Sequence, residues 1–214
     1  MMKTQEYWEA KHPPIRQMYS GRPLPGTTRM YPIDVRHFVW ATDWRLQDIA
    51  GGLRNDNVDV TAWNCQRWVV RNIKYIADSR FGVPEFWMTP GETLELGSDD
   101  CEGGSHLMAS LMLHCLPKEH HWRVRCTAGW VAMETTAPDG GHDYVTFFRA
   151  ADNEPVVCDW CYAEDSTVPM DKKPLLKTVT MYHDAWFSYN HVAAWGYKTL
   201  EMRGRVRRVD AGWR

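Results

Sequence analysis

The hydrophobic pattern of the chain changes at Pro117, and this change limits the possible folds more than any other feature. Before it, apolar residues recur at steps of three and four, the spacing of buried helical faces. After it come short runs rich in strand-forming residues, separated by turn-forming stretches: WRVRCTAGWVAME, HDYVTFFRA and EPVVCDWCY. Helices followed by antiparallel strands predict an α+β fold in which helices pack on one side of an antiparallel β-sheet.

Three segments before Pro117 have the pattern of helices. Residues 42–53 begin with a possible cap and end at paired glycines, which predicts a short helix. Residues 58–78 predict a longer helix with one buried face. That face comprises Ala62, Cys65, Val69, Ile73 and Ile76. A further helix is predicted to begin with Asp99 or Asp100 as its cap. Its inward positions are Leu107, Met108, Leu111 and Met112.

The length of 214 residues and the hydrophobic content of 44% fit one large domain, which we place at residues 35–200. Residues 1–34 hold five prolines and few periodic apolar positions, so we expect an extended proline-rich arm. Residues 201–214 hold five arginines against two carboxylates, which predicts an arginine-rich C-terminal tail. The arm and the tail are possible contacts for an assembly partner.

The composition argues against several classes of protein. A formal net charge of −2 gives no reason to expect a nucleic-acid partner. The sequence has no apolar signal region at its start and no stretch near the roughly 18 apolar residues that span a bilayer. We therefore expect no membrane association and a cytoplasmic location, or a virion location if the chain is phage-encoded. Six cysteines are too few for a disulfide framework, so we expect free thiols.

Twelve tryptophans are an unusually large number for a chain of this length. One interpretation is an aromatic core. The other is a groove walled by indole faces, which would suit a peptide or another planar ligand. The sequence leaves both open.

Cys101 is predicted to lie in the first turn of a helix, between acidic neighbours. The first turn offers unpaired N–H groups and the positive end of the helix dipole, both of which favour a thiolate. Asp99, Asp100 and Glu102 would oppose ionisation if they pointed at the sulfur. We therefore expect these three carboxylates to cap the helix or to bind nearby backbone.

A thiolate nucleophile needs a base, and the base needs a group that fixes its orientation. His142 follows the turn APDGG and opens one predicted strand. Asp159 lies in the next predicted strand, EPVVCDWCY, in a mostly apolar setting. Neighbouring antiparallel strands bring such residues together, so Cys101, His142 and Asp159 are predicted to form a catalytic triad.

Five stretches carry a resemblance to a known family. They are WVVRNIKY (68–75), FWMTPGETLELGSDDCE (86–102), SHLMASLML (105–113), GGHDYVTFF (140–148) and VVCDW (156–160). In content and order they resemble the transglutaminase-like cysteine peptidase superfamily, and the bacterial and phage members most closely. The resemblance covers roughly residues 55–165, so residues 35–200 are expected to form a transglutaminase-like catalytic domain.

The resemblance implies a papain-like fold with Cys101 as nucleophile, His142 as general base and acid, and Asp159 as the orienting carboxylate. Two departures from the family pattern concern neighbours of this triad. The usual Gly-Asp-Cys-Glu-Asp is Asp-Asp-Cys-Glu-Gly at residues 99–103, and the aromatic residue two places after the histidine is Tyr144 rather than tryptophan.

The expected reaction is acyl transfer through an acyl-enzyme on Cys101. With water as acceptor, the protein is a cysteine peptidase or amidase acting on a peptide or protein. With a lysine amine as acceptor, it is a crosslinking transglutaminase. We favour the hydrolase because water needs no acceptor site. The backbone N–H of Cys101 is expected to hold the oxyanion. Three side chains are alternatives for a second donor: Asn64, Gln66 and Trp87.

Two other interpretations stay open. CDWC at 158–161 has a spacing that zinc accepts, but the remaining cysteines offer no second pair, so we expect no metal and no cofactor. Residues three apart on a strand also face opposite sides, so Cys158 and Cys161 converge only if the strand ends there. The second alternative is a non-catalytic virion or assembly protein on the same fold.

Overall fold

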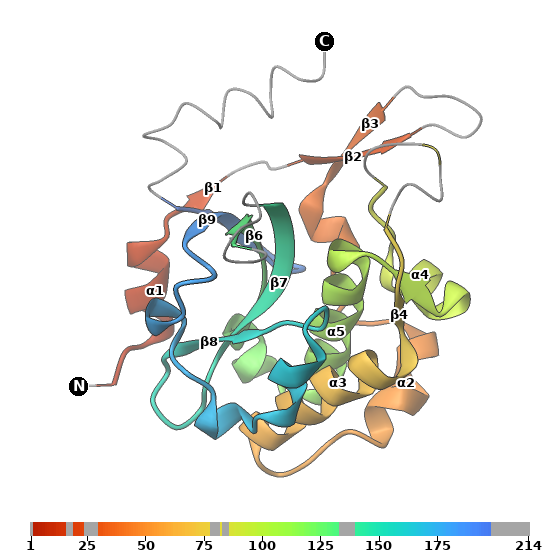
Figure 1. Cartoon of the computed structure of the whole chain (residues 1–214). Helices are drawn as coiled ribbons and strands as arrows, with labels where there is room; N and C mark the ends of the chain where they lie inside the picture. The colour runs from red at the N-terminus through yellow and green to blue at the C-terminus, as the bar shows by residue number, and fades with distance from the viewer. Residues whose placement is uncertain are drawn as a thin grey trace.

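The computed structural model describes residues 2–15, 19–23, 30–77, 82, 86–132 and 140–197 (Figure 1). The α-helices are α1 (Gln5–Lys11), α2 (Trp44–Gly51), α3 (Val58–Asn72), α4 (Pro90–Leu96) and α5 (Cys101–Cys115). The strands are β1 (Pro14–Ile15), β2 (Tyr19–Pro23), β3 (Met30–Asp34), β4 (Lys74–Tyr75), β5 (Ser98–Asp99), β6 (Val124–Val131), β7 (Gly140–Phe148), β8 (Pro155–Cys158), β9 (Asp184–Tyr189) and β10 (Ala194–Gly196). Short 3-10 turns connect several of them.

A six-stranded antiparallel sheet organises the molecule. Its strand order is β1-β10-β9-β6-β7-β8, and every neighbouring pair is antiparallel. The three strands predicted after Pro117 are β6, β7 and β8, which form a meander. The strand β9 pairs with the other edge of β6 and lies beyond the sequence motifs. The predicted α+β fold, with helices packed on an antiparallel sheet, is confirmed.

Helix α5 occupies the centre of the molecule, between the sheet and the helices α2, α3 and α4 (Figure 1). Its predicted inward positions are fully buried: Leu107, Met108, Leu111 and Met112. Nearly all of its other residues are buried too, as expected for a helix that has neighbours on every side. The first residue of this central helix is Cys101, so the predicted nucleophile begins the most deeply packed element.

Helix α3 is shorter than predicted. It ends at Asn72, and the following residues form β4, which pairs in parallel with β5. Ala62, Cys65 and Val69 are fully buried as predicted, but Ile76 lies outside the helix, where its N–H donates to Asp99 O at 2.8 Å. The run Ile73–Ile76 is rich in β-branched and aromatic residues, which favours this extended pairing over another helical turn. The pairing fixes the chain immediately before Cys101.

The expected extended arm contains a helix. Thr4 caps α1 by accepting a hydrogen bond from the Tyr7 N–H, and Trp8 is buried. The Trp8 indole donates to Asn153 O at 2.8 Å and contacts Phe148 of β7, on the side of the sheet opposite α5 (Figure 1). The buried tryptophan supplies the packing that favours the helix. The rest of the arm contributes β1, β2 and β3, and the predicted tail lies outside the described residues.

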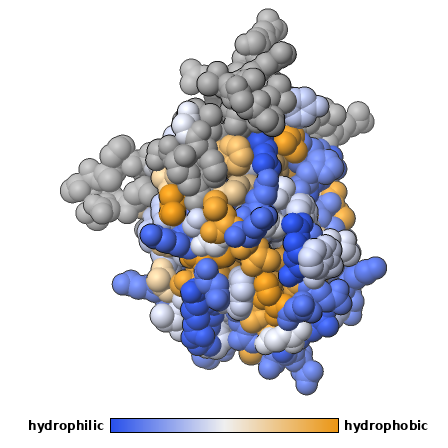
Figure 2. Space-filling view, turned by 90° about the vertical axis from the view of Figure 1, so that its right-hand side faces the viewer, coloured by the Kyte–Doolittle hydropathy of each residue, from blue (hydrophilic) through white to orange (hydrophobic). Residues whose placement is uncertain are grey.

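The tryptophans lie both inside the protein and at its surface. Trp8, Trp87, Trp160 and Trp195 are buried, which agrees with the interpretation as an aromatic core. Trp44 of α2 is 81% exposed. Figure 2 shows the face that carries α2 and α4, where hydrophobic residues reach the surface between hydrophilic ones. Within the described residues, no helix has the length and apolar character required to cross a membrane.

Candidate active site

Asp99 and Asp100 hold the start of α5 in place. The Asp99 carboxylate is completely buried and accepts hydrogen bonds from Thr93 Oγ1 at 2.5 Å and from the Asp100 N–H at 2.9 Å. Asp100 occupies the cap position, but its side chain makes no capping hydrogen bond. The expected binding of backbone by these carboxylates is therefore confirmed for Asp99, while Asp100 contributes only its backbone to the cap.

The expectation for Glu102 was wrong. The Cys101 thiol donates a hydrogen bond to Glu102 Oε2 at 3.0 Å, so this carboxylate faces the sulfur. Burial, together with the charges of Glu102 and Asp100, raises the pKa of the Cys101 thiol well above its usual range, and a backbone hydrogen bond from Asp143 acts in the opposite direction. In this conformation the thiol, not the thiolate predicted from the helix dipole, is the favoured form.

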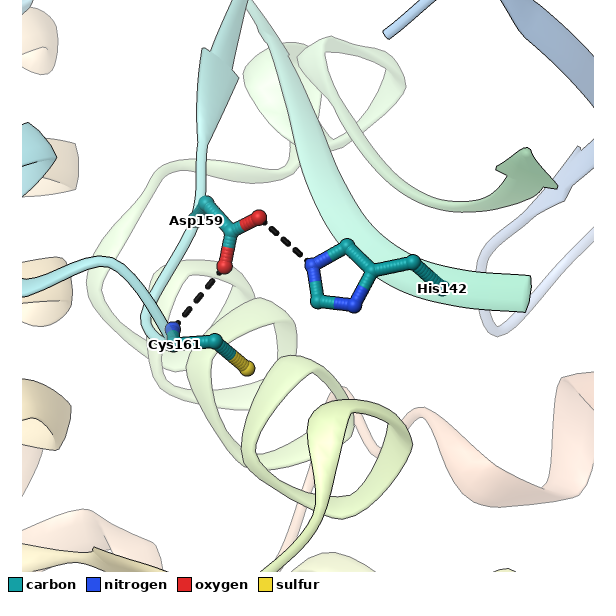
Figure 3. Close-up of side chains that lie close together, drawn as sticks. All are labelled: His142, Asp159 and Cys161. Carbon is teal, nitrogen blue, oxygen red and sulfur yellow. Dashed lines mark hydrogen bonds and ion pairs between the residues drawn. The ribbon is translucent and has the colours of Figure 1, made fainter. Parts of the chain in front are cut away.

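His142 and Asp159 are joined directly (Figure 3). His142 lies in β7, and Asp159 is the first residue after β8, which pairs with β7 up to Cys158. His142 Nε2 and Asp159 Oδ2 are 2.6 Å apart, and the two side chains are 4% and 0% exposed. The sheet therefore brings together the two residues that the sequence predicted as base and orienting group.

Four further hydrogen bonds fix Asp159, one of which its own N–H donates to Asp165 Oδ2 at 3.0 Å. Tyr182 donates its hydroxyl to Asp159 Oδ2 at 2.8 Å, and the Cys161 N–H donates to Oδ1 at 2.9 Å. Gln66 Nε2 donates to the Asp159 carbonyl oxygen at 2.9 Å. Both carboxylate oxygens thus have donors before any substrate is present, and the imidazole orientation is set in advance.

The start of α5 is tied to the sheet close to this pair. The Trp160 indole donates to the Cys101 carbonyl oxygen at 3.1 Å, and Ser105 Oγ donates to the Asp143 carbonyl oxygen at 3.1 Å. Only glycine fits at position 104, because a Cβ there would lie 2.0 Å from the Trp160 ring. Within the described part of the chain, however, no hydrogen bond joins Cys101 to His142. Of the predicted triad, His142 and Asp159 are hydrogen-bonded to each other, whereas the thiol of Cys101 is hydrogen-bonded to Glu102.

The departure from the family pattern at residues 99–103 has a steric explanation. Asp99 and Gly103 are four residues apart and face each other across the helix start, where a Cβ on Gly103 would lie 1.6 Å from Asp99 Oδ2. The Asp99 carboxylate therefore fills the space that a side chain at position 103 would need.

Two of the three side chains considered as second oxyanion donors are engaged elsewhere. Gln66 uses both amide hydrogens, on the Asp159 carbonyl oxygen and on Asp165 Oδ2. Asn64 donates to the Leu53 carbonyl oxygen at 3.1 Å. Trp87 is buried, with its ring 5.1 Å from that of His106. Gln66 supports Asp159 and is not a donor to the oxyanion.

Sequence reasoning missed two residues at this site. Tyr182 lies in a segment that the motifs do not cover, and only its hydrogen bond to Asp159 reveals its place. Cys161 was considered only as a partner of Cys158, whose sulfur instead lies 3.5 Å from Met170 Sδ. The ligand atoms of Cys161, His142 and Asp159 all lie within 4.8 Å of one another (Figure 3). The spacing of Asp159 and Cys161, just past the end of β8, was the available signal.

A chain of buried polar groups runs under the site. His106 Nδ1 is 3.1 Å from the Met88 carbonyl oxygen, and His106 Nε2 is 2.7 Å from the Tyr189 hydroxyl. The same hydroxyl is 2.8 Å from Asp143 Oδ2. Burial lowers the pKa of His106 to about 3. This chain ends at the residue next to His142.

No family model matches the chain, and no curated protein sequence matches it. Solved structures with a similar fold include LapG of Legionella pneumophila in its calcium-bound form, with 18% identity, 72% of this chain and 87% of that chain covered, and a TM-score of 0.48. Another LapG structure shows 17% identity, 83% and 99% coverage, and a TM-score of 0.48. A provisionally named cysteine protease from Cytophaga hutchinsonii shows 18% identity, 62% and 40% coverage, and a TM-score of 0.43.

The α+β fold rests on the sheet and helices described above, and the site rests on its hydrogen bonds.

Proposed function

We propose that the protein is a thiol-dependent acyl-transfer enzyme that hydrolyses amide bonds in a peptide or protein, with Cys101, His142 and Asp159 as its catalytic residues. The observation that carries this proposal is the buried hydrogen bond between His142 Nε2 and Asp159 Oδ2, formed beside a helix that begins with a thiol. This bond makes Nε2 the donor, which leaves Nδ1 of the imidazole to accept the thiol proton.

The reaction follows from these positions. The Cys101 proton passes to His142 Nδ1 while the sulfur attacks the substrate carbonyl carbon. The backbone N–H of Cys101 lies in the first turn of α5, where N–H groups have no acceptor within the helix, and it stabilises the oxyanion. His142 then protonates the leaving amine, and an acyl-thioester remains on Cys101. In the second half, His142 removes a proton from water, which attacks the thioester and regenerates the thiol.

The resting arrangement sets one requirement for this reaction. The thiol proton points toward Glu102, so the Cys101 or the Glu102 side chain must rotate before sulfur and imidazole can meet. Such a rotation lowers the pKa of the thiol by separating it from the carboxylate. Substrate binding is the step at which we place it, because a substrate at the helix start would occupy the space beside the sulfur.

The test uses an activated acyl ester as substrate. The wild-type protein should release one equivalent of nitrophenolate in a burst from a p-nitrophenyl ester, and mass spectrometry should locate the acyl group on Cys101. Cys101→Ser and His142→Ala should abolish the burst, while Cys115→Ser, at the opposite end of α5, should retain it. Folded wild-type protein that shows neither a burst nor an adduct contradicts the proposal and favours the non-catalytic assembly role.

The same acyl-enzyme distinguishes the two acceptors. We expect water to release the acyl group, so that added primary amines leave the yield of free acid unchanged. If the amine is acylated in place of water, the enzyme is a crosslinking transglutaminase. A peptide-amide library can then define the substrate class for whichever acceptor is used.

A further inference from the structure

A second thiol lies beside the catalytic pair. Cys161 follows Asp159 by two residues, and its sulfur lies within 4.8 Å of ligand atoms of both His142 and Asp159 (Figure 3). We propose that His142, Asp159 and Cys161 form a binding site for zinc, and that zinc bound there switches the enzyme off. Binding itself depends only on this geometry, whereas the inhibition rests on the proposed function.

The three donors are an imidazole nitrogen, a carboxylate oxygen and a sulfur, which are the three ligand types that zinc takes in proteins. Three protein ligands leave a fourth, tetrahedral position open for water. The ligands come from one strand and the loop after the next strand, so they converge from two directions. Small shifts are needed to bring donors within 4.8 Å of one another to zinc distances of about 2.0–2.3 Å.

Groups around the ligands already hold them in place. Tyr182 donates to Asp159 Oδ2, and the Cys161 N–H donates to Asp159 Oδ1. Hydrogen bonds of this kind orient metal ligands in zinc sites.

The proton balance explains the inhibition. His142 Nε2 and Asp159 Oδ2, 2.6 Å apart, share one hydrogen. Zinc takes the place of this hydrogen, which moves to Nδ1 of the neutral imidazole, and the Cys161 thiol releases its proton to solvent. One proton is therefore released for each zinc bound, and nothing is oxidised or reduced. Because Nδ1 then carries a hydrogen, it no longer accepts the proton of Cys101.

Cobalt(II) is the probe, since it replaces zinc and reports its ligands by absorption. In wild-type protein, cobalt should produce a thiolate-to-cobalt charge-transfer band and intense visible bands of a tetrahedral site, and zinc should bleach both. Cys161→Ser should remove the charge-transfer band. Cys101→Ser should retain it, which separates this site from Asp100, Cys101 and Glu102, whose ligand atoms also lie within 4.8 Å of one another.

The cobalt bands of the variants distinguish the two possible metal sites. A band that persists in Cys161→Ser and disappears in Cys101→Ser overturns the inference, because the metal then binds at the helix start. Absence of a band in wild-type protein overturns it as well. Loss of the band in both Cys161→Ser and Cys161→Ala, with each variant unfolding at the same temperature as the wild type, supports it.

Ester turnover tests the inhibition separately. Zinc should suppress the burst of the wild-type enzyme, whereas Cys161→Ala should give the same burst with zinc as that variant gives without it. Cobalt binding at Cys161 in a protein that never forms an acyl-enzyme leaves the metal site standing and removes the proposed function. An active enzyme that binds no cobalt at Cys161 supports the proposed function and overturns the metal site.

Discussion

The two halves of the candidate active site differ in how completely they are assembled. The His142–Asp159 half is complete, with a 2.6 Å hydrogen bond and donors on both oxygens of Asp159. The Cys101 half is not, because the thiol bonds to Glu102 and its pKa is raised. The sheet fixes the first half through backbone pairing, whereas the second depends on side-chain rotation at one helix end. A rearrangement on substrate binding is therefore expected on the thiol side.

Asp159→Asn is expected to have the largest effect, since it disables the assembled half. An asparagine oxygen can still orient the ring, but it does not stabilise the imidazolium, and its amide can favour the wrong tautomer. We expect kcat for ester hydrolysis to fall by about 10³–10⁴ with the fold retained. Asp171→Asn, at an exposed carboxylate, should leave kcat unchanged. A loss below tenfold in Asp159→Asn would show that the base works without its partner.

Gly104→Ala tests the contact between α5 and Trp160, which connects the two halves of the site. The added Cβ would overlap the Trp160 ring, which must move and release the Cys101 carbonyl oxygen. Overpacking of this kind costs about 1–3 kcal/mol of unfolding free energy. Urea unfolding followed by circular dichroism measures it, and Gly51→Ala, where no atom lies within 4 Å of the new Cβ, is the matched control. Equal unfolding free energies of the two variants would show that the Trp160 ring can move away from position 104 without cost.

Glu102→Gln tests whether the Glu102 carboxylate raises the pKa of the Cys101 thiol. Removing the carboxylate charge lowers the pKa of the Cys101 thiol, so the pH curve of iodoacetamide alkylation should shift toward lower pH. Mass spectrometry of the peptide that contains Cys101 provides the rate at each pH. The exposed Glu119→Gln should leave the curve in place. A curve that stays fixed in Glu102→Gln would show that this carboxylate does not control the thiol.

Tyr182→Phe should have the smallest effect. It removes one of the donors to Asp159 and leaves those of His142 and Cys161. The loss of a single hydrogen bond is worth about 1 kcal/mol, so kcat should fall by less than about tenfold while KM is unchanged. The exposed Tyr31→Phe is the control. A loss as large as that of Asp159→Asn would place the Tyr182 hydroxyl in the chemistry itself.

Local patterns were sufficient to predict the assembled half. His142 lies on β7 and Asp159 directly follows β8, and a short turn joins these two strands, so adjacency along the chain implied adjacency in space. The start of α5 was predicted for the same reason, from its cap and apolar spacing. Neither Tyr182 nor Cys161 was, because both lie in irregular segments where no periodicity indicates direction. The Glu102 contact was missed because a side-chain rotation leaves no trace in sequence.

The buried chain under the site has a consequence that emerges when its hydrogens are counted. The Met88 carbonyl oxygen can only accept a hydrogen bond, so Nδ1 of the neutral His106 ring carries its hydrogen and Nε2 is an acceptor. The Tyr189 hydroxyl has one hydrogen, which lies between two acceptors, His106 Nε2 and Asp143 Oδ2. This hydroxyl therefore links the histidine inside α5 to the residue beside His142.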